Sequence, residues 1–96
     1  MNLNVKLRDG FNGETVTVRI DGKEVFRKAV KTDLTISLAD MINAAVQKPS
    51  VDVEIAVEGG PTVRREVQVN ETPFVDVRVS DGKLLIQPSR EEIPML

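Results

Sequence analysis

The sequence predicts an all-β protein, a single β-sandwich domain spanning residues 1–96 with about 7–8 mostly antiparallel strands. Three observations predict this class. Apolar and polar residues alternate over many short segments, as in half-buried strands. Turn-forming residues separate these segments at intervals of about 8 to 12 residues. Only one short stretch, near 38–47, has the apolar period of a helix.

The first strand is expected at residues 3–7. Leu3, Val5 and Leu7 would face the core, whereas Lys6 and Arg8 would face solvent. The loop at 9–13 holds several oxygen-bearing side chains, but their spacing does not match a calcium-binding EF-hand loop. We therefore predict a structural turn and no metal site.

The clearest hairpin signal is the Asp21-Gly22 pair within residues 14–30. A two-residue turn would pair Ile20 with Lys23 and place Phe26 on the polar face. A three-residue loop, residues 21–23, keeps Val18 opposite Phe26 with both side chains inside. We predict the longer loop.

A short strand is expected at residues 34–38, followed by one short helix at about 38–47. Apolar residues recur there at steps of three and four. They are Leu38, Met41, Ile42, Ala45 and Val46. Ser37 and Asp40 resemble a capping box, and Pro49 would end the helix.

The segment at 51–57 and the one returning after Gly59-Gly60-Pro61 form a second predicted hairpin. Matching apolar residues places Val57 opposite Val63, Val53 opposite Val67, and Arg65 opposite Ile55 on the core face. An unpaired guanidinium is costly to bury, so Arg65 either marks the edge of the sheet or anchors an anionic ligand. The edge is the favoured interpretation.

The third hairpin turns at Asp81-Gly82. A two-residue loop suits it, because Val79 then pairs with Leu84 and Val77 with Ile86. Residues 88–96 follow as a polar tail with an apolar end, which is either loose or laid over the sandwich as a strap.

The missing residue types limit the chemistry. The chain has no His and no Cys, so the common zinc and redox-metal sites and Ser-His or Cys-His catalysis are excluded. It also has no Trp and no Tyr, which removes the usual groups for stacking on sugars or bases. We expect no enzyme activity, no cofactor and no catalytic or metal-binding residue.

Charge is distributed unevenly along the chain. Residues 1–31 carry a net charge of +3 and residues 32–96 one of −5, which together give −2. This balance disfavours nucleic acid as a partner. No apolar run is long enough to span a membrane, and the N-terminus lacks the apolar core of a secretion signal. We expect a cytoplasmic protein with no membrane contact.

The turn spacing and a helix at the crossing between sheets are typical of an immunoglobulin- or transthyretin-like sandwich. Four strings, FNGETVTVRIDGKEVFRK, TDLTISLAD, ETPFVDVRVSDGKL and QPSREE, resemble small uncharacterised bacterial proteins built from one β-sandwich. The resemblance runs from about residue 11 to 92. It implies a fold and a bacterial source, and no activity.

The leading functional hypothesis is a non-catalytic binding or protein-interaction module, acting as a homo-oligomer or with a protein partner. The possible binding residues are Arg19, Lys23, Arg27 and Arg65. The alternative is a small-ligand or carbohydrate-binding sandwich, which the lack of Trp and Tyr disfavours. A hydrolase using paired carboxylates is the remote alternative, because Glu91 and Glu92 are adjacent in the tail and Glu14 and Glu24 lie at strand ends.

Overall fold

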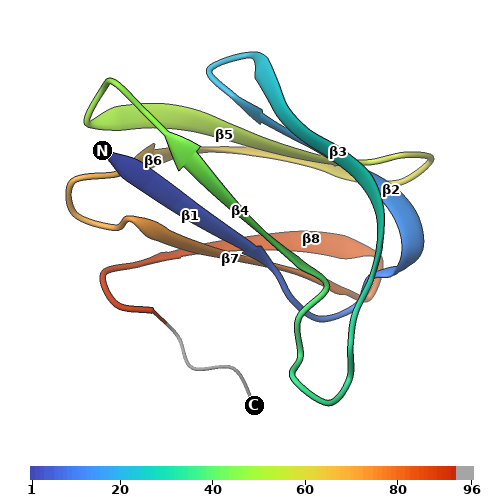
Figure 1. Ribbon diagram of the computed structural model, residues 1–96. Helices are drawn as coiled ribbons and strands as arrows, with labels where there is room; N and C mark the ends of the chain where they lie inside the picture. The colour runs from blue at the N-terminus through green and yellow to red at the C-terminus, as the bar shows by residue number, and fades with distance from the viewer. Residues whose placement is uncertain (93–96) are drawn as a thin grey trace.

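The computed structural model describes residues 1–92, which form eight strands in two four-stranded sheets (Figure 1). Sheet A has the order β4-β1-β7-β8, and sheet B has the order β3-β2-β5-β6. The strands of sheet A are β1 (Asn2–Leu7), β4 (Asp40–Ala45), β7 (Phe74–Ser80) and β8 (Lys83–Ser89). Those of sheet B are β2 (Asn12–Ile20), β3 (Lys23–Lys31), β5 (Ser50–Val57) and β6 (Thr62–Gln68). The predicted all-β class and strand number are confirmed.

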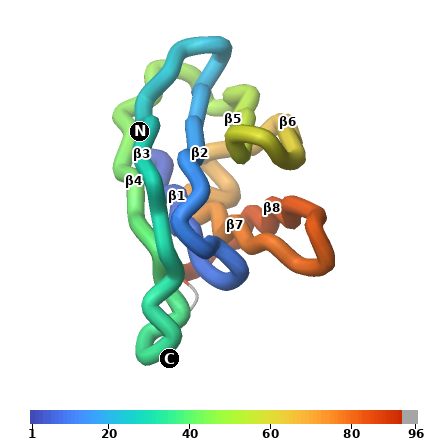
Figure 2. The backbone as a smooth tube through the Cα atoms, turned by 90° about the vertical axis from the view of Figure 1, so that its right-hand side faces the viewer, coloured from blue at the N-terminus to red at the C-terminus, as the bar shows by residue number. Residues whose placement is uncertain are grey.

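The core lies between the two sheets and is rich in valine. Alternate residues of each strand supply it, because side chains in a strand point to opposite faces in turn. Its fully buried members include Leu3, Val5, Leu7, Val16, Val18, Val53, Ile55, Val75 and Val77. At one side of the molecule β3 of sheet B lies beside β4 of sheet A (Figure 2). At the other side β6 contacts β8.

The central strand β1 joins distant parts of the chain. It pairs antiparallel with β4 and parallel with β7. The β1–β7 pair is the one parallel ladder within residues 1–92. This pairing places Lys6 directly beside Asp76 on the outer face of sheet A.

The predicted helix at 38–47 is wrong. Residues 40–45 form the edge strand β4, with Ile42 and Ala44 buried and Met41 exposed. The segment fits the period of a strand as well as that of a helix, because apolar residues also occur at every second position, at Ile42, Ala44 and Val46. Pairing with the open edge of β1 decides in favour of the strand.

The short strand expected at 34–38 is also wrong. Only an isolated bridge between Asp33 and Leu38 forms there, and Leu34 is among the most exposed apolar residues. Ser37, proposed as the helix cap, adopts a positive φ of 53° within this loop.

The first hairpin has the two-residue turn together with the Val18–Phe26 pair that was expected only for a three-residue loop. Ile20 pairs with Lys23 across a two-residue turn, so the predicted three-residue loop is wrong. Val18 nevertheless lies opposite Phe26, as predicted, because a β-bulge at Val25 restores the register. The length of the turn does not decide the register alone, because the extra residue is accommodated within strand β3.

The second hairpin has the predicted faces in a shifted register. Ile55 pairs with Val63, Val53 with Arg65, and Val51 with Val67, a displacement of two residues from the prediction. The amide of Val57 donates to the carbonyl of Pro61 at 2.9 Å, so the connecting loop is shorter than expected. A shift of two residues keeps every side chain on the same face.

The third hairpin has the predicted pairs, Val79 with Leu84 and Val77 with Ile86. Strand β8 continues to Ser89, so the first two residues of the predicted tail belong to the sheet. Residues 90–92 follow the sheet, and residues 93–96 of the predicted tail lie outside the described part of the chain.

Candidate functional site

The outer face of sheet A carries a buried charged cluster, formed by Lys6, Arg8 and Asp76. Their exposed fractions are 2%, 4% and 3%. Lys6 and Arg8 do point away from the core, as predicted, but they are not solvated. Burying charged groups is costly unless they are paired, so the partners of these three residues are the next question.

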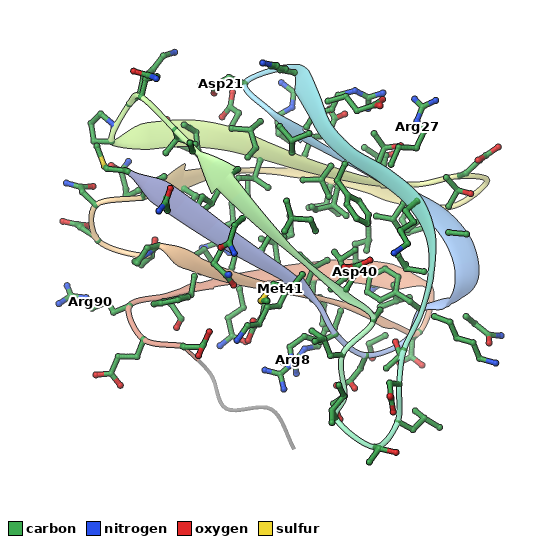
Figure 3. The ribbon with its side chains drawn as sticks, viewed as in Figure 1. Arg8, Asp21, Arg27, Asp40, Met41 and Arg90 are labelled. Carbon is green, nitrogen blue, oxygen red and sulfur yellow. The ribbon has the colours of Figure 1, made fainter. Side chains whose placement is uncertain are left out.

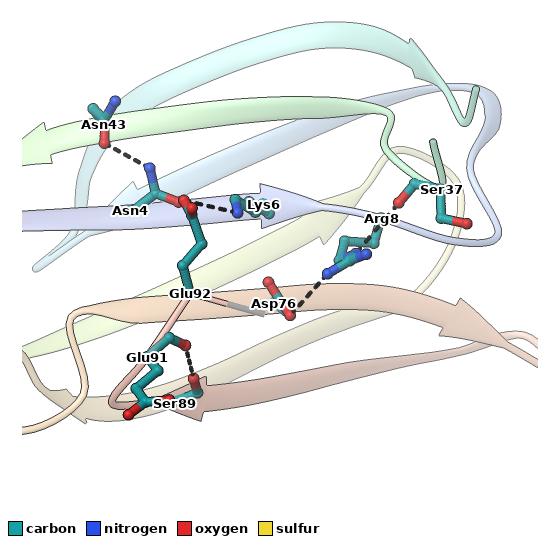
Figure 4. Close-up of polar contacts among 9 residues, drawn as sticks. All are labelled: Asn4, Lys6, Arg8, Ser37, Asn43, Asp76, Ser89, Glu91 and Glu92. Atoms are coloured by element: carbon teal, nitrogen blue, oxygen red, sulfur yellow. Dashed lines mark hydrogen bonds and ion pairs between the residues drawn. The ribbon is translucent and has the colours of Figure 1, made fainter. Parts of the chain in front are cut away.

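The cluster is built on the parallel pair β1–β7 (Figure 4). Arg8 Nη1 lies 3.4 Å from Asp76 Oδ2, and Arg8 Nε donates to the carbonyl of Ser37 at 3.3 Å. The backbone of Arg8 is fixed from two sides. Its amide donates to the carbonyl of Val77 at 2.7 Å, and its carbonyl accepts from Thr32 Oγ1 at 2.6 Å.

Lys6 receives its counter-charge from the residues after β8. Its Nζ lies 3.0 Å from Glu92 Oε2 (Figure 4). Among the described residues this ammonium finds no acceptor in hydrogen-bond geometry, so the contact is an ion pair only. The hydroxyl of Ser89 donates to the carbonyl of Glu91 at the end of β8. Glu92 thus contacts Lys6 from residues 90–92, which follow β8 and pair with no strand among residues 1–92.

A groove of about 340 Å³ lies at one end of the sandwich. It is bounded by the β2–β3 turn and the residues that connect β4 to β5. Its apolar lining includes Ile20, Val25, Ala44, Val46 and Val51. Two lysines, Lys23 and Lys48, also line it, and Val25 at the bulge is 38% exposed. The groove therefore combines apolar surface with positive charge.

The carboxylate of Asp21 lies at this groove. Its Oδ1 accepts a hydrogen bond from the amide of Asp52 at 2.8 Å, and its Oδ2 lies 3.5 Å from Lys48 Nζ. The hydrogen bond from Asp52, and to a lesser degree the charge of Lys48, lower the pKa of Asp21 below its ordinary value. The carboxylate is thus held in its charged form beside the turn.

The predicted binding residues do not form one site. Lys23 lines the groove, whereas Arg19 and Arg27 lie on the outer face of sheet B, beside a hollow of about 310 Å³. Asp21 and Arg27 lie on the sheet B side of the sandwich and Arg8 on the sheet A side (Figure 3).

Acidic neighbours balance the arginines on the outer face of sheet B. Arg19 Nη1 lies 2.9 Å from Glu54 Oε2, and Arg27 Nη2 lies 2.9 Å from Glu24 Oε1. Glu24, Arg19, Glu54 and Arg64 face one another in register across all four strands. Alternating charges of this kind are typical of a stable, solvated sheet face.

Arg65 lies on the edge strand β6, as the favoured interpretation predicted. Its Nη1 donates to the carbonyl of Ile86 at 3.1 Å, so the guanidinium is used in a contact between the sheets.

Within residues 1–92, no group of three or more acidic, His or Cys side chains is placed to hold a metal ion. The same residues contain no helix that is long and apolar enough to cross a membrane. No protein-family model, curated protein or solved structure matches this chain.

Proposed function

We propose that this chain is a non-catalytic protein-binding module and that the groove beside the β2–β3 turn is its binding surface. One observation carries this proposal. The groove lies where the edge strands of both sheets, β3 and β4, come together, and its lining is mainly apolar. Apolar surface at an open sheet edge is a common docking place for an extended segment of another protein.

The seam between β3 and β4 is closed at one end and open at the other. Lys28 Nζ lies 3.1 Å from Asp40 Oδ2, which connects the two strands. Toward Val25 and Ala44 the seam becomes the groove. Among residues 1–92 neither strand has a ladder partner on this side, which leaves the edge of each open to a partner strand.

Charge indicates the chemistry of the partner. Strand β3 carries four basic residues and one acidic residue, and at the groove itself the two lysines, Lys23 and Lys48, outnumber the one carboxylate, Asp21. An extended segment with apolar residues and flanking carboxylates complements this surface.

A small ligand is the second candidate, and the volume of the groove is the observation in its favour. About 340 Å³ falls at the lower end of the range for small-molecule sites. The lining contains no aromatic side chain, which leaves a carbohydrate without a stacking surface.

Several expectations from the sequence belong to the same proposal. They are an immunoglobulin- or transthyretin-like variety of sandwich, a bacterial source, a cytoplasmic location, and a partner that is either a protein or a second copy of the chain. The antiparallel ladders in two packed four-stranded sheets support the first of these.

The test is selection from a displayed library of random peptides against the purified protein. We expect enrichment of peptides that combine apolar and acidic residues. Val25→Glu should weaken binding of the selected peptides at least tenfold, because it places a charge in the apolar lining. The matched control is Leu85→Glu, which changes an exposed apolar residue on the outer face of sheet A. Absence of any enriched family, or equal binding by Val25→Glu and wild type, would contradict the proposal.

A further inference from the structure

The buried cluster on sheet A has one positive charge more than its own strands can balance. Lys6 and Arg8 are cationic, and Asp76 is the one carboxylate that β7 supplies to them. Glu92, beyond the last strand, places a second carboxylate 3.0 Å from Lys6 Nζ. The ion-pair partner of Lys6 is thus a residue that lies outside the two sheets.

The Lys6–Glu92 pair is strongly asymmetric in its exposure. The side chain of Lys6 is 2% exposed, whereas that of Glu92 is 57% exposed. The ammonium is fixed in a central strand, and the carboxylate approaches it from the solvent side. Lys6 Nζ carries three N–H donors, and within residues 1–92 none is engaged in a hydrogen bond. The ammonium therefore has donors to offer a better-placed carboxylate.

We propose that Lys6, held beside the Arg8–Asp76 pair, forms a carboxylate-binding site that Glu92 of the same chain fills. The ligand is the acidic side chain of an extended peptide segment, which replaces Glu92 when a partner binds. Glu92 competes as an intramolecular ligand at high effective concentration, so the site is closed until a partner segment displaces it. This inference uses a different face from the groove and is independent of it.

The first experiment removes the internal carboxylate and supplies one from solution. Glu92→Ala removes the carboxylate that contacts the buried Lys6 ammonium, so we expect the thermal midpoint to fall by about 5 °C. Sodium acetate should then raise the midpoint of this variant saturably, as expected for a ligand that binds only the folded state. Sodium chloride at equal ionic strength is the salt control. Wild type and Glu91→Ala should show no acetate-specific rise.

Two further variants keep the test decisive. Glu92→Gln preserves the size of the side chain and serves if the alanine variant does not fold. Lys6→Met combined with Glu92→Ala should lose the response to acetate, because the ammonium is gone. A midpoint unchanged by loss of the Glu92 carboxylate, or no acetate-specific rise in either Glu92 variant, would overturn the site.

A second arm distinguishes a peptide ligand from a free small carboxylate. The probe is the blocked tripeptide Gly-Glu-Gly, compared with blocked Gly-Gln-Gly. Stabilisation of the Glu92→Ala variant by the glutamyl peptide alone supports recognition of an acidic segment. Stabilisation by acetate without any effect of the glutamyl peptide would overturn the assignment to a partner segment.

Discussion

The guanidinium of Arg65 donates a hydrogen bond to the backbone carbonyl of Ile86 at 3.1 Å and connects edge strand β6 to edge strand β8. On the opposite side of the sandwich, Lys28 and Asp40 connect β3 to β4 at 3.1 Å. On each side of the sandwich, a basic residue of sheet B thus connects the edge strand of sheet B to the edge strand of sheet A. The two bridges hold the sheets together where the apolar core ends.

Replacing Arg65 tests the first bridge. Arg65→Met keeps an apolar stem of similar length and removes the hydrogen bond. We expect the free energy of unfolding to fall by about 1 kcal/mol, since the contact is only partly buried. Urea denaturation measures the change. Arg64→Met is the control, because Arg64 makes only a long ion pair of 3.9 Å with Glu54, and it should have almost no effect. Equal losses in the two variants would argue against the bridge.

Deleting Val25 tests the bulge in the first hairpin. The deletion leaves the Ile20–Lys23 and Val18–Phe26 pairs in one regular register. The variant should fold and lose about 1 kcal/mol or less, because Val25 is partly exposed. Deleting Arg27 instead should be far more damaging, since it moves the buried Val30 toward the outer face. Amide spectra and urea denaturation compare the two. A Val25 deletion that prevents folding would refute this interpretation.

Removing the carboxylate of Asp76 should be severe. Asp76→Ala removes the carboxylate that pairs with the buried Arg8 at 3.4 Å, and we expect a loss of about 3 kcal/mol in stability. The control is Glu66→Ala, at an exposed position of β6, which should stay within about 0.5 kcal/mol of wild type. Chemical denaturation gives both values. A small loss for Asp76→Ala would mean that the cluster is better hydrated than its burial indicates.

Asp21 should contribute to the stability of the fold in a pH-dependent way. Its pKa is lowered in the folded state, chiefly by the hydrogen bond from the Asp52 amide. Its contribution is therefore complete above the ordinary carboxyl pKa of 3.8 and is lost as pH falls through the lowered folded value. Asp21→Asn keeps a residue that tolerates the positive φ of 51° and removes the titrating group. Thermal midpoints measured from pH 7 down to pH 2 should fall less steeply for this variant. An unchanged acid dependence would assign the effect to other carboxylates.

Alternation was sufficient to predict which residues of the hairpin strands face the core. Val18 with Phe26, and Val77 with Ile86, are paired as expected because each combination alone buries two large groups. Alternation was insufficient for β4, because its segment fits both the helical and the strand period of apolar residues. Pairing with the open edge of β1 selects the strand. It also left the β5–β6 register open, because a shift of two residues preserves both faces.

The charged cluster was missed for a related reason. The outward direction of Lys6 and Arg8 follows from local sequence, but their burial depends on parts of the chain far away, among them β7 and Glu92. One signal was present, an aspartate at position 76 between the two core valines Val75 and Val77. A lone carboxylate in a central strand indicates a cation opposite it.

The parallel pairing of β1 with β7 also has a consequence for biosynthesis. Arg8 and Asp76, which meet at this pair, are separated by 68 residues in the chain. Strand β1 is synthesised well before β7, its parallel neighbour. Contacts between such distant segments slow folding, since a long loop must close before they form. We therefore expect sheet B, whose hairpins are local, to form early, and sheet A to be completed only after β7 and β8 have been synthesised.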